Sequence, residues 1–141
     1  MATGTDLALP LLLARLYDEV LRRYNEALRT VGCTAEEWWV LTFLAREGGR
    51  PMHEIAEFAG LPKPTLTKVV DRMVAGNLAY RRVDVTDRRR VLVSCTVRGL
   101  ETHARARGAV GAVEADLERL VGGAKLAGLR DALAEAASRL P

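Results

Sequence analysis

Two basic segments separated by a short apolar stretch carry the residue types best suited to contact a polyanion. Residues 61–73 read LPKPTLTKVVDRM, and residues 84–90 read DVTDRRR. Lysine, arginine and threonine side chains bind phosphate oxygens and the hydrogen-bonding edges of bases. A short helix followed by a hairpin with arginines at its tip suits duplex DNA. The helix can enter a major groove while the tip reaches the neighbouring minor groove.

The charge distribution supports that interpretation better than the total charge does. The chain of 141 residues carries a net charge of only +3. Residues 63–105, however, hold ten Lys/Arg and four Asp/Glu, a net charge of +6, whereas residues 1–62 carry −3. A basic module on an otherwise balanced chain is the electrostatic pattern of a phosphate binder, although a solvated basic face is the simpler alternative.

The spacing of apolar residues within 61–73 predicts a helix with one buried face. Leu66, Val69, Val70 and Met73 recur at i, i+3, i+4 and i+7. The polar residues then point largely outward, with Thr65 on the flank. The expected DNA contacts on this helix are base edges or phosphates for Thr65, Thr67 and Lys68, a thymine methyl for Pro64, and phosphates for Lys63 and Arg72.

The second segment is expected to form the tip of a hairpin between two apolar strands, residues 78–83 and 91–95. Arg88 and Arg89 are expected to enter or border a minor groove, and Arg90 to touch a phosphate. Asp87 repels phosphate, so its expected role is to orient an arginine through a charge-assisted bond.

The elements that must position these residues are mostly helical. We predict helices over about 6–30, from 34 to 47, over 51–59 and over 63–75, then the hairpin, then helices from 96 to about 121 and from about 123 to 140, in the order ααααββαα. Thr34-Ala35-Glu36-Glu37 is a capping box. The fold class is therefore mainly α with a small β-hairpin, a winged helix-turn-helix within one domain spanning 1–141. The DNA-binding lobe covers about 34–96, and helices at about 6–31 and 97–140 are strongly apolar, which favours homodimerisation.

Other candidate sites are weaker. Tyr17, Tyr24, Trp38, Trp39 and Phe43 form an aromatic set near the junction of these parts, either a ligand pocket or simply core. Cys33 stands before the Thr34 cap, where thiolate character can rise, so a redox role is an alternative. Two cysteines and two histidines, all scattered, give no metal site, and we expect no cofactor. No phosphate loop or catalytic triad pattern is present, so an enzyme is not expected.

Four stretches resemble the MarR family (multiple antibiotic resistance regulators). Residues 61–73 are similar to the family's recognition helix, and Asp84-Val85-Thr86-Asp87-Arg88-Arg89 to its wing signature. Thr96-Val97-Arg98-Gly99 matches the family's entry to the fifth helix. Thr34-Ala35-Glu36-Glu37-Trp38 resembles the entry to the second, with Glu37 in place of Gln.

The resemblance implies a homodimeric regulator of transcription, most often a repressor, that binds a pseudo-palindromic double-stranded DNA operator. A small lipophilic or phenolic effector often releases such proteins, and a subset senses oxidants through cysteine. Cytoplasmic residence fits the absence of a signal peptide or a membrane span in the sequence. An RNA-binding or interaction protein on a winged-helix scaffold is the alternative from another class.

Overall fold

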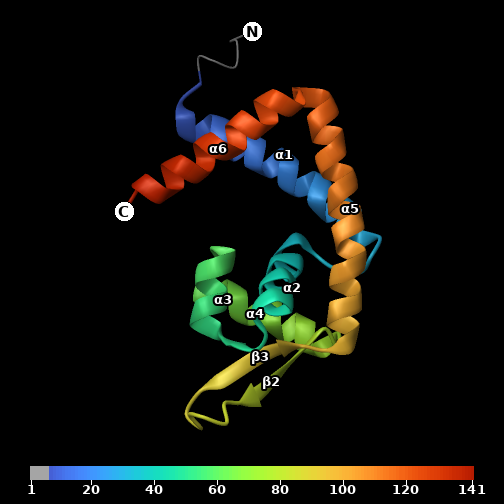
Figure 1. Ribbon diagram of the computed structural model, residues 1–141, viewed down its shortest axis with the longest axis vertical. Coiled ribbons are helices and arrows are strands. Elements are labelled where there is room, and N and C mark those ends of the chain that lie inside the picture. The colour runs from blue at the N-terminus through green and yellow to red at the C-terminus, as the bar shows by residue number, and fades with distance from the viewer. Residues whose placement is uncertain (1–6) are drawn as a thin grey trace.

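The computed structural model describes residues 7–141 as a small lobe joined by one long helix to a pair of helices (Figure 1). The elements are α1 (Leu9–Arg29), α2 (Ala35–Glu47), β1 (Arg50–Pro51), α3 (Met52–Ala59), α4 (Lys63–Ala75), β2 (Ala79–Val83), β3 (Val91–Cys95), α5 (Val97–Val121) and α6 (Gly123–Arg139). The mainly helical class with a small antiparallel sheet is confirmed. Residue 6, where we expected the first helix to begin, lies outside the described residues.

The sheet contains one strand that the sequence did not reveal. β1 pairs with β3, which pairs with β2, all antiparallel, so that the order is β1-β3-β2. β1 has only two residues, Arg50 and Pro51, which are too few to show the period-2 alternation that predicts a strand. The hairpin itself runs from the pair Ala79 and Cys95 to the pair Val83 and Val91.

The lobe is built around the apolar face of α4. Leu66, Val69, Val70 and Met73 are all at most 1% exposed, as their spacing predicts. They pack with buried residues of α2, α3, β2 and β3, among them Leu41, Ile55 and Val93. This one core fixes which side of α4 faces solvent.

A second, smaller core joins the lobe to α1 and α5. Leu28 of α1, Cys33 and Ala35 at the start of α2, and Ala106 and Val110 of α5 form it. Thr34 completes the expected capping box: its hydroxyl accepts from the Glu37 N–H at 3.2 Å, and the Glu37 carboxylate accepts from the Thr34 N–H at 3.1 Å. The first turn of α2 is thereby fixed beside the end of α1.

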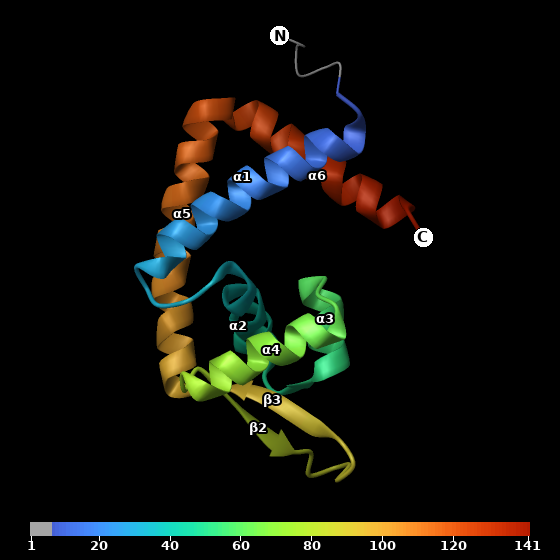
Figure 2. The same ribbon diagram turned by 180° about the vertical axis from the view of Figure 1, so that it is seen from behind.

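α1 and α6 form an arm at the end of the molecule opposite the hairpin, with α5 running past both (Figures 1 and 2). The arm is poorly covered. Leu28 is the buried residue of α1, and no residue of α6 is buried. Large apolar side chains of the arm and of the end of α5 are 41–72% exposed, including Leu9, Leu16, Leu120 and Leu140. None of the helices within residues 7–141 is long and apolar enough to cross a membrane.

Two glycines of α5 allow a matched test of the packing between α5 and the lobe. A methyl group on Gly99 would overlap the Leu78 carbonyl oxygen, whereas one on Gly108 would meet nothing within 4 Å. We expect Gly99→Ala to destabilise the fold by about 1–3 kcal/mol, as overpacking does. Gly108→Ala should instead raise stability by up to about 1 kcal/mol, because alanine favours helix. Urea unfolding of both variants at equal protein concentration measures the difference, and equal stabilities would contradict the close approach.

Candidate nucleic-acid interface and effector pocket

The N-terminal half of α4 presents a polar, basic surface. Lys63, Pro64, Thr67 and Lys68 are exposed, and Thr65 is half-buried on the flank. The Thr67 hydroxyl donates to the Lys63 carbonyl oxygen at 3.0 Å, which leaves its oxygen free only as an acceptor. Lys68 is thus the exposed cation of this surface in the middle of the helix.

Arg72 lies differently from the sequence-based expectation of a phosphate contact. Its guanidinium lies between two carboxylates at the start of α2, with Nη2 3.6 Å from a Glu36 oxygen and Nε 3.6 Å from a Glu37 oxygen. The preceding residue, Asp71, pairs with Arg81 of β2 at 2.6 Å. Neither partner could be read from the helical period, because both lie on other elements.

The loop between β2 and β3 is organised by two aspartates. Asp84 is buried and accepts hydrogen bonds from the backbone N–H and the hydroxyl of Thr86, at 2.9 and 2.7 Å. These bonds stabilise the carboxylate and hold its pKa below the ordinary value. The Asp84 N–H in turn donates to the Arg90 carbonyl oxygen at 2.9 Å, closing the loop. Sequence reasoning assigned an orienting role to Asp87 alone and missed this role of Asp84.

Asp87 lies where it was expected to act, beside an arginine. Its carboxylate accepts from the Arg89 N–H at 3.1 Å and lies 3.6 Å from Arg89 Nε. The Arg89 side chain nevertheless stays 94% exposed, and Arg88 and Arg90 are also exposed. The hairpin with its loop, residues 79–95, is called the wing below. Its loop carries three arginines, Arg88, Arg89 and Arg90, into solvent, and the wing belongs to the same lobe as α4 (Figure 2).

Four of the five expected aromatic residues do come together. Tyr17 and Tyr24 of α1 and Trp38 and Trp39 of α2 line a cavity of about 360 Å³, here called the aromatic pocket. The rings of Tyr24 and Trp38 are 6.2 Å apart between centroids.

Phe43 does not belong to that set, so this part of the prediction is wrong. It stacks on Phe58 of α3, with ring centroids 4.6 Å apart, and Arg46 lies over the Phe58 ring. Phe43 is four residues beyond Trp39 on α2, one helical turn of about 6 Å towards α3. The helix that carries Phe43 was predicted correctly, but not how far along it the aromatic set extends.

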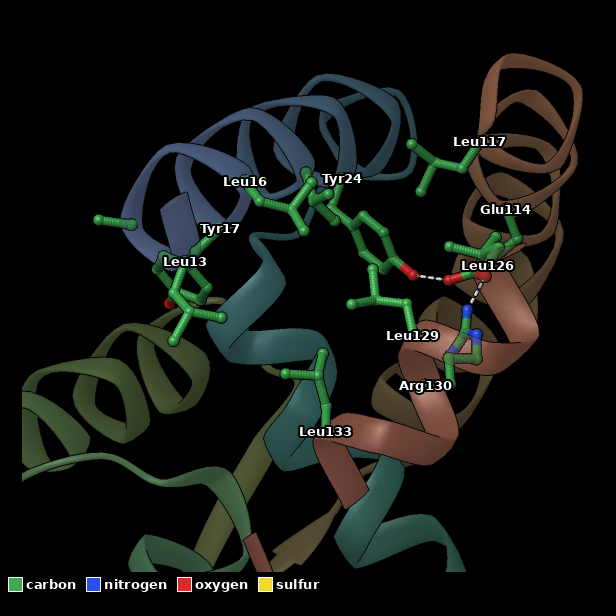
Figure 3. Close-up of a pocket in the computed structure, with 12 residues that line it drawn as sticks. Leu13, Leu16, Tyr17, Tyr24, Glu114, Leu117, Leu126, Leu129, Arg130 and Leu133 are labelled. Carbon is green, nitrogen blue, oxygen red and sulfur yellow. Dashed lines mark hydrogen bonds and ion pairs between the residues drawn. The ribbon is translucent and has the colours of Figure 1, made fainter. Parts of the chain in front are cut away.

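An adjoining aliphatic pocket of about 560 Å³ lies between α1, α5 and α6, lined mainly by leucines (Figure 3). Tyr24, Glu114 and Arg130 line both pockets. The Tyr24 hydroxyl donates to one oxygen of Glu114, and the Arg130 guanidinium donates to the other. These three side chains come from α1, α5 and α6, and sequence reasoning missed Glu114 and Arg130 because no spacing connects them.

Cys33 is not an activated thiol in this structure. It is 6% exposed, and burial, together with the nearby Glu37 carboxylate, raises its pKa to about 11. Burial also raises the pKa of Cys95 to about 11. The helix N-terminus that motivated the redox hypothesis is outweighed by desolvation and by Glu37. Among residues 7–141, no three His, Cys, Asp or Glu side chains are grouped to hold a metal ion.

Comparison with known proteins gives a family match and close structural neighbours. Residues 31–90 match a family model described as MarR family. MhqR, an HTH-type transcriptional regulator of Bacillus subtilis (strain 168), is 29% identical over 98 residues, 70% of this chain and 68% of MhqR. The transcriptional repressor CouR bound to a 23-mer DNA duplex has a TM-score of 0.88 at 28% identity, covering 97% of this chain and 98% of CouR. NadR in complex with 4-hydroxyphenylacetate has a TM-score of 0.75 at 22% identity, covering 99% of both chains, a likeness that shows the fold.

The lobe with its α3–α4 pair and wing is a winged helix-turn-helix, here joined to long helices at both ends of the chain. Together with the matches above, this architecture identifies a winged-helix transcriptional regulator. Residues 31–90 match the MarR family, and the whole fold is similar to that of the regulator CouR.

The raised pKa of Cys33 predicts a slow, pH-dependent reaction with iodoacetamide. In Cys95→Ala protein at pH 7.5, Cys33 should react roughly 100-fold more slowly in the native than in the urea-unfolded state, because its pKa lies about two units above the usual value of 9.0. The folded state also binds the proton of the Cys33 thiol more tightly than the unfolded state does. The stability that this proton adds is therefore present below pH 9 and is lost as the pH rises through 11. Native and unfolded rates that coincide at pH 7.5 would restore the redox hypothesis.

Proposed function

We propose that the protein is a homodimeric repressor that binds a pseudo-palindromic DNA operator with α4 and the wing. The observation that carries this proposal is the common placement of the exposed α4 cations, Lys63 and Lys68, and the wing arginines on one lobe. The net charge of +6 over residues 63–105 supplies the sequence-independent attraction to phosphate. CouR, at 28% identity, is described as a DNA-bound repressor, which supports the same function here.

The second subunit is proposed from the arm. The arm exposes several leucines to water, and burying them against a second copy is favourable at about 25 cal/mol per Å². A dimer also places two α4 helices at a fixed spacing, which doubles the base contacts.

The effector is proposed to be a small lipophilic or phenolic molecule in the aromatic pocket. Its walls are aromatic and aliphatic, and besides the two tryptophans its lining residues with polar groups are Tyr17, Tyr24, Glu114 and Arg130. The indole N–H of Trp38, which lines the same pocket, is buried without an acceptor among residues 7–141. Such a site suits an apolar body with one polar end that accepts hydrogen bonds.

Selection of duplexes from a random pool tests DNA binding and symmetry together, and Arg88→Ala/Arg89→Ala tests the wing. We expect two inverted half-sites.

If both arginines contact DNA, the slope of log K against log salt for the selected operator should fall by roughly 2 in Arg88→Ala/Arg89→Ala, since each contacted phosphate contributes about 0.9. Stability should change by less than about 0.5 kcal/mol, because both side chains are exposed. Binding of single-stranded RNA in preference to any duplex would favour the RNA-binding alternative, and an unchanged salt slope would remove the wing from the interface.

Arg130→Gln tests the pocket with two probes of equal size, 4-hydroxyphenylacetate and the neutral 4-hydroxyphenylethanol. The acid should lose at least about 10-fold in affinity, the effect of one charge-assisted hydrogen bond, and the alcohol far less. Quenching of Trp38 and Trp39, the chain's two tryptophans, measures binding without DNA. Arg139→Gln is the matched control, because Arg139 also lies on α6 but its one ion-pair partner among residues 7–141 is the exposed Glu135. Equal losses in both variants would exclude a specific role for Arg130.

A further inference from the structure

Arg72 is the one basic side chain of α4 beyond its first two turns, and its guanidinium is committed to the protein. The two carboxylates that hold it, Glu36 and Glu37, are consecutive residues in the first turn of α2. Its side chain is 54% exposed, so the guanidinium remains accessible from solvent. Exposed ion pairs at such distances are worth about 0–1 kcal/mol. The guanidinium is therefore free to bind another anion once the two carboxylate charges are removed.

Glu37 is unusually well fixed for the partner of an exposed arginine. Only 8% of it is exposed, and one carboxylate oxygen accepts the Thr34 N–H of the capping box while the other faces Arg72. A flexible surface glutamate would follow the arginine, whereas this one is held in place by the backbone of α2. The position of the α2 first turn thus determines where the Arg72 guanidinium lies.

The same first turn is bonded to α1. The Asn25 side-chain oxygen of α1 accepts from the Ala35 N–H at 2.9 Å, and the Leu28 carbonyl oxygen accepts from the Cys33 N–H at 3.3 Å. A continuous series of contacts therefore runs from α1 through the start of α2 to Arg72 of α4. On α4 the adjacent Asp71 is paired with Arg81 of β2, so the helix is held by charge on two sides.

We propose that Glu37, assisted by Glu36, is a positioning residue for DNA binding: it holds Arg72 away from the phosphates and makes the orientation of α4 depend on the α1–α2 junction. This inference rests on the proposed function, because it assumes that α4 binds DNA. While Glu36 and Glu37 hold Arg72, this side chain adds no sequence-independent attraction to DNA, and the affinity for the operator exceeds that for other DNA. With Arg72 released, the side chain binds any phosphate and the preference falls.

The test is a cycle of variants measured on the selected operator and on a random duplex over a range of salt. Glu36→Gln/Glu37→Gln keeps an amide oxygen for the Thr34 N–H and removes both charges facing Arg72. We expect the salt slope on random DNA to steepen by about 0.9, one more phosphate contact, and the ratio of operator to random affinity to fall several-fold. Arg72→Gln alone should leave the slope on random DNA unchanged and weaken the operator several-fold. Arg72→Lys should recover part of that loss.

The decisive comparison is the pair of Glu changes made in the Arg72→Gln background. If the glutamates act through Arg72, the slope should not steepen there. A slope that steepens equally in both backgrounds would show simple removal of negative charge and overturn the proposal. A lower slope in Arg72→Gln alone would also overturn it, because Arg72 would then contact phosphate already.

Two controls separate this proposal from its premise. Glu135→Gln removes a carboxylate of α6 whose one ion-pair partner in the described part of the chain is Arg139, and it should change neither the salt slope nor the preference for the operator. If the double glutamine variant fails to fold, Arg72→Gln, which changes an exposed side chain, still decides the outcome through its slope. A wild-type protein that binds no duplex would instead refute the proposed function.

Discussion

The apolar face of α4 is the constraint on which the rest of the lobe depends. Because Leu66, Val69, Val70 and Met73 must all be covered, the helix can lie against α2, α3 and the sheet in only one rotation. That rotation leaves Lys63, Thr67 and Lys68 in solvent, and it turns Asp71 and Arg72 to opposite neighbours, β2 and α2. The surface proposed to read DNA is thus a by-product of how the core is filled.

The arm obeys a different constraint. It shares the small core around Leu28, Ala106 and Val110 with the lobe, and no residue of α6 is fully buried within one chain. Helices with exposed leucines on several faces gain little from folding alone, because most helical stability comes from burying an apolar face. The stability proposed to come from a second subunit therefore depends on protomer concentration in a way that the stability of the lobe does not.

Features that depend on neighbouring residues were predicted from the sequence, whereas features that depend on contacts between distant elements were not. Caps, helical periods and the hairpin depend on neighbours in sequence, so the elements and the buried face of α4 were predictable. The partners of Arg72, the cluster of Tyr24, Glu114 and Arg130, and the place of Phe43 depend on where helices cross, which no local spacing encodes. The strand β1 was not predicted for a third reason, because two residues are too few to show the alternation of a strand. The redox alternative at Cys33 rested on the nearby helix terminus and not on burial and Glu37, which raise the pKa of this thiol.

The proposed effector and the proposed positioning residue meet on α2. Trp38 and Trp39 line the aromatic pocket, and the residues immediately before them, Glu36 and Glu37, hold Arg72. A ligand changes DNA affinity only by binding one arrangement of the protein better than another. A molecule that moves the tryptophans relative to α1 acts on the first turn of α2, because the tryptophans follow that turn on the same helix and Asn25 of α1 bonds to it. A shift too small to alter the lobe core would then suffice to lengthen ion pairs that are already 3.6 Å long and to release the Arg72 guanidinium, without any change in the fold of α4.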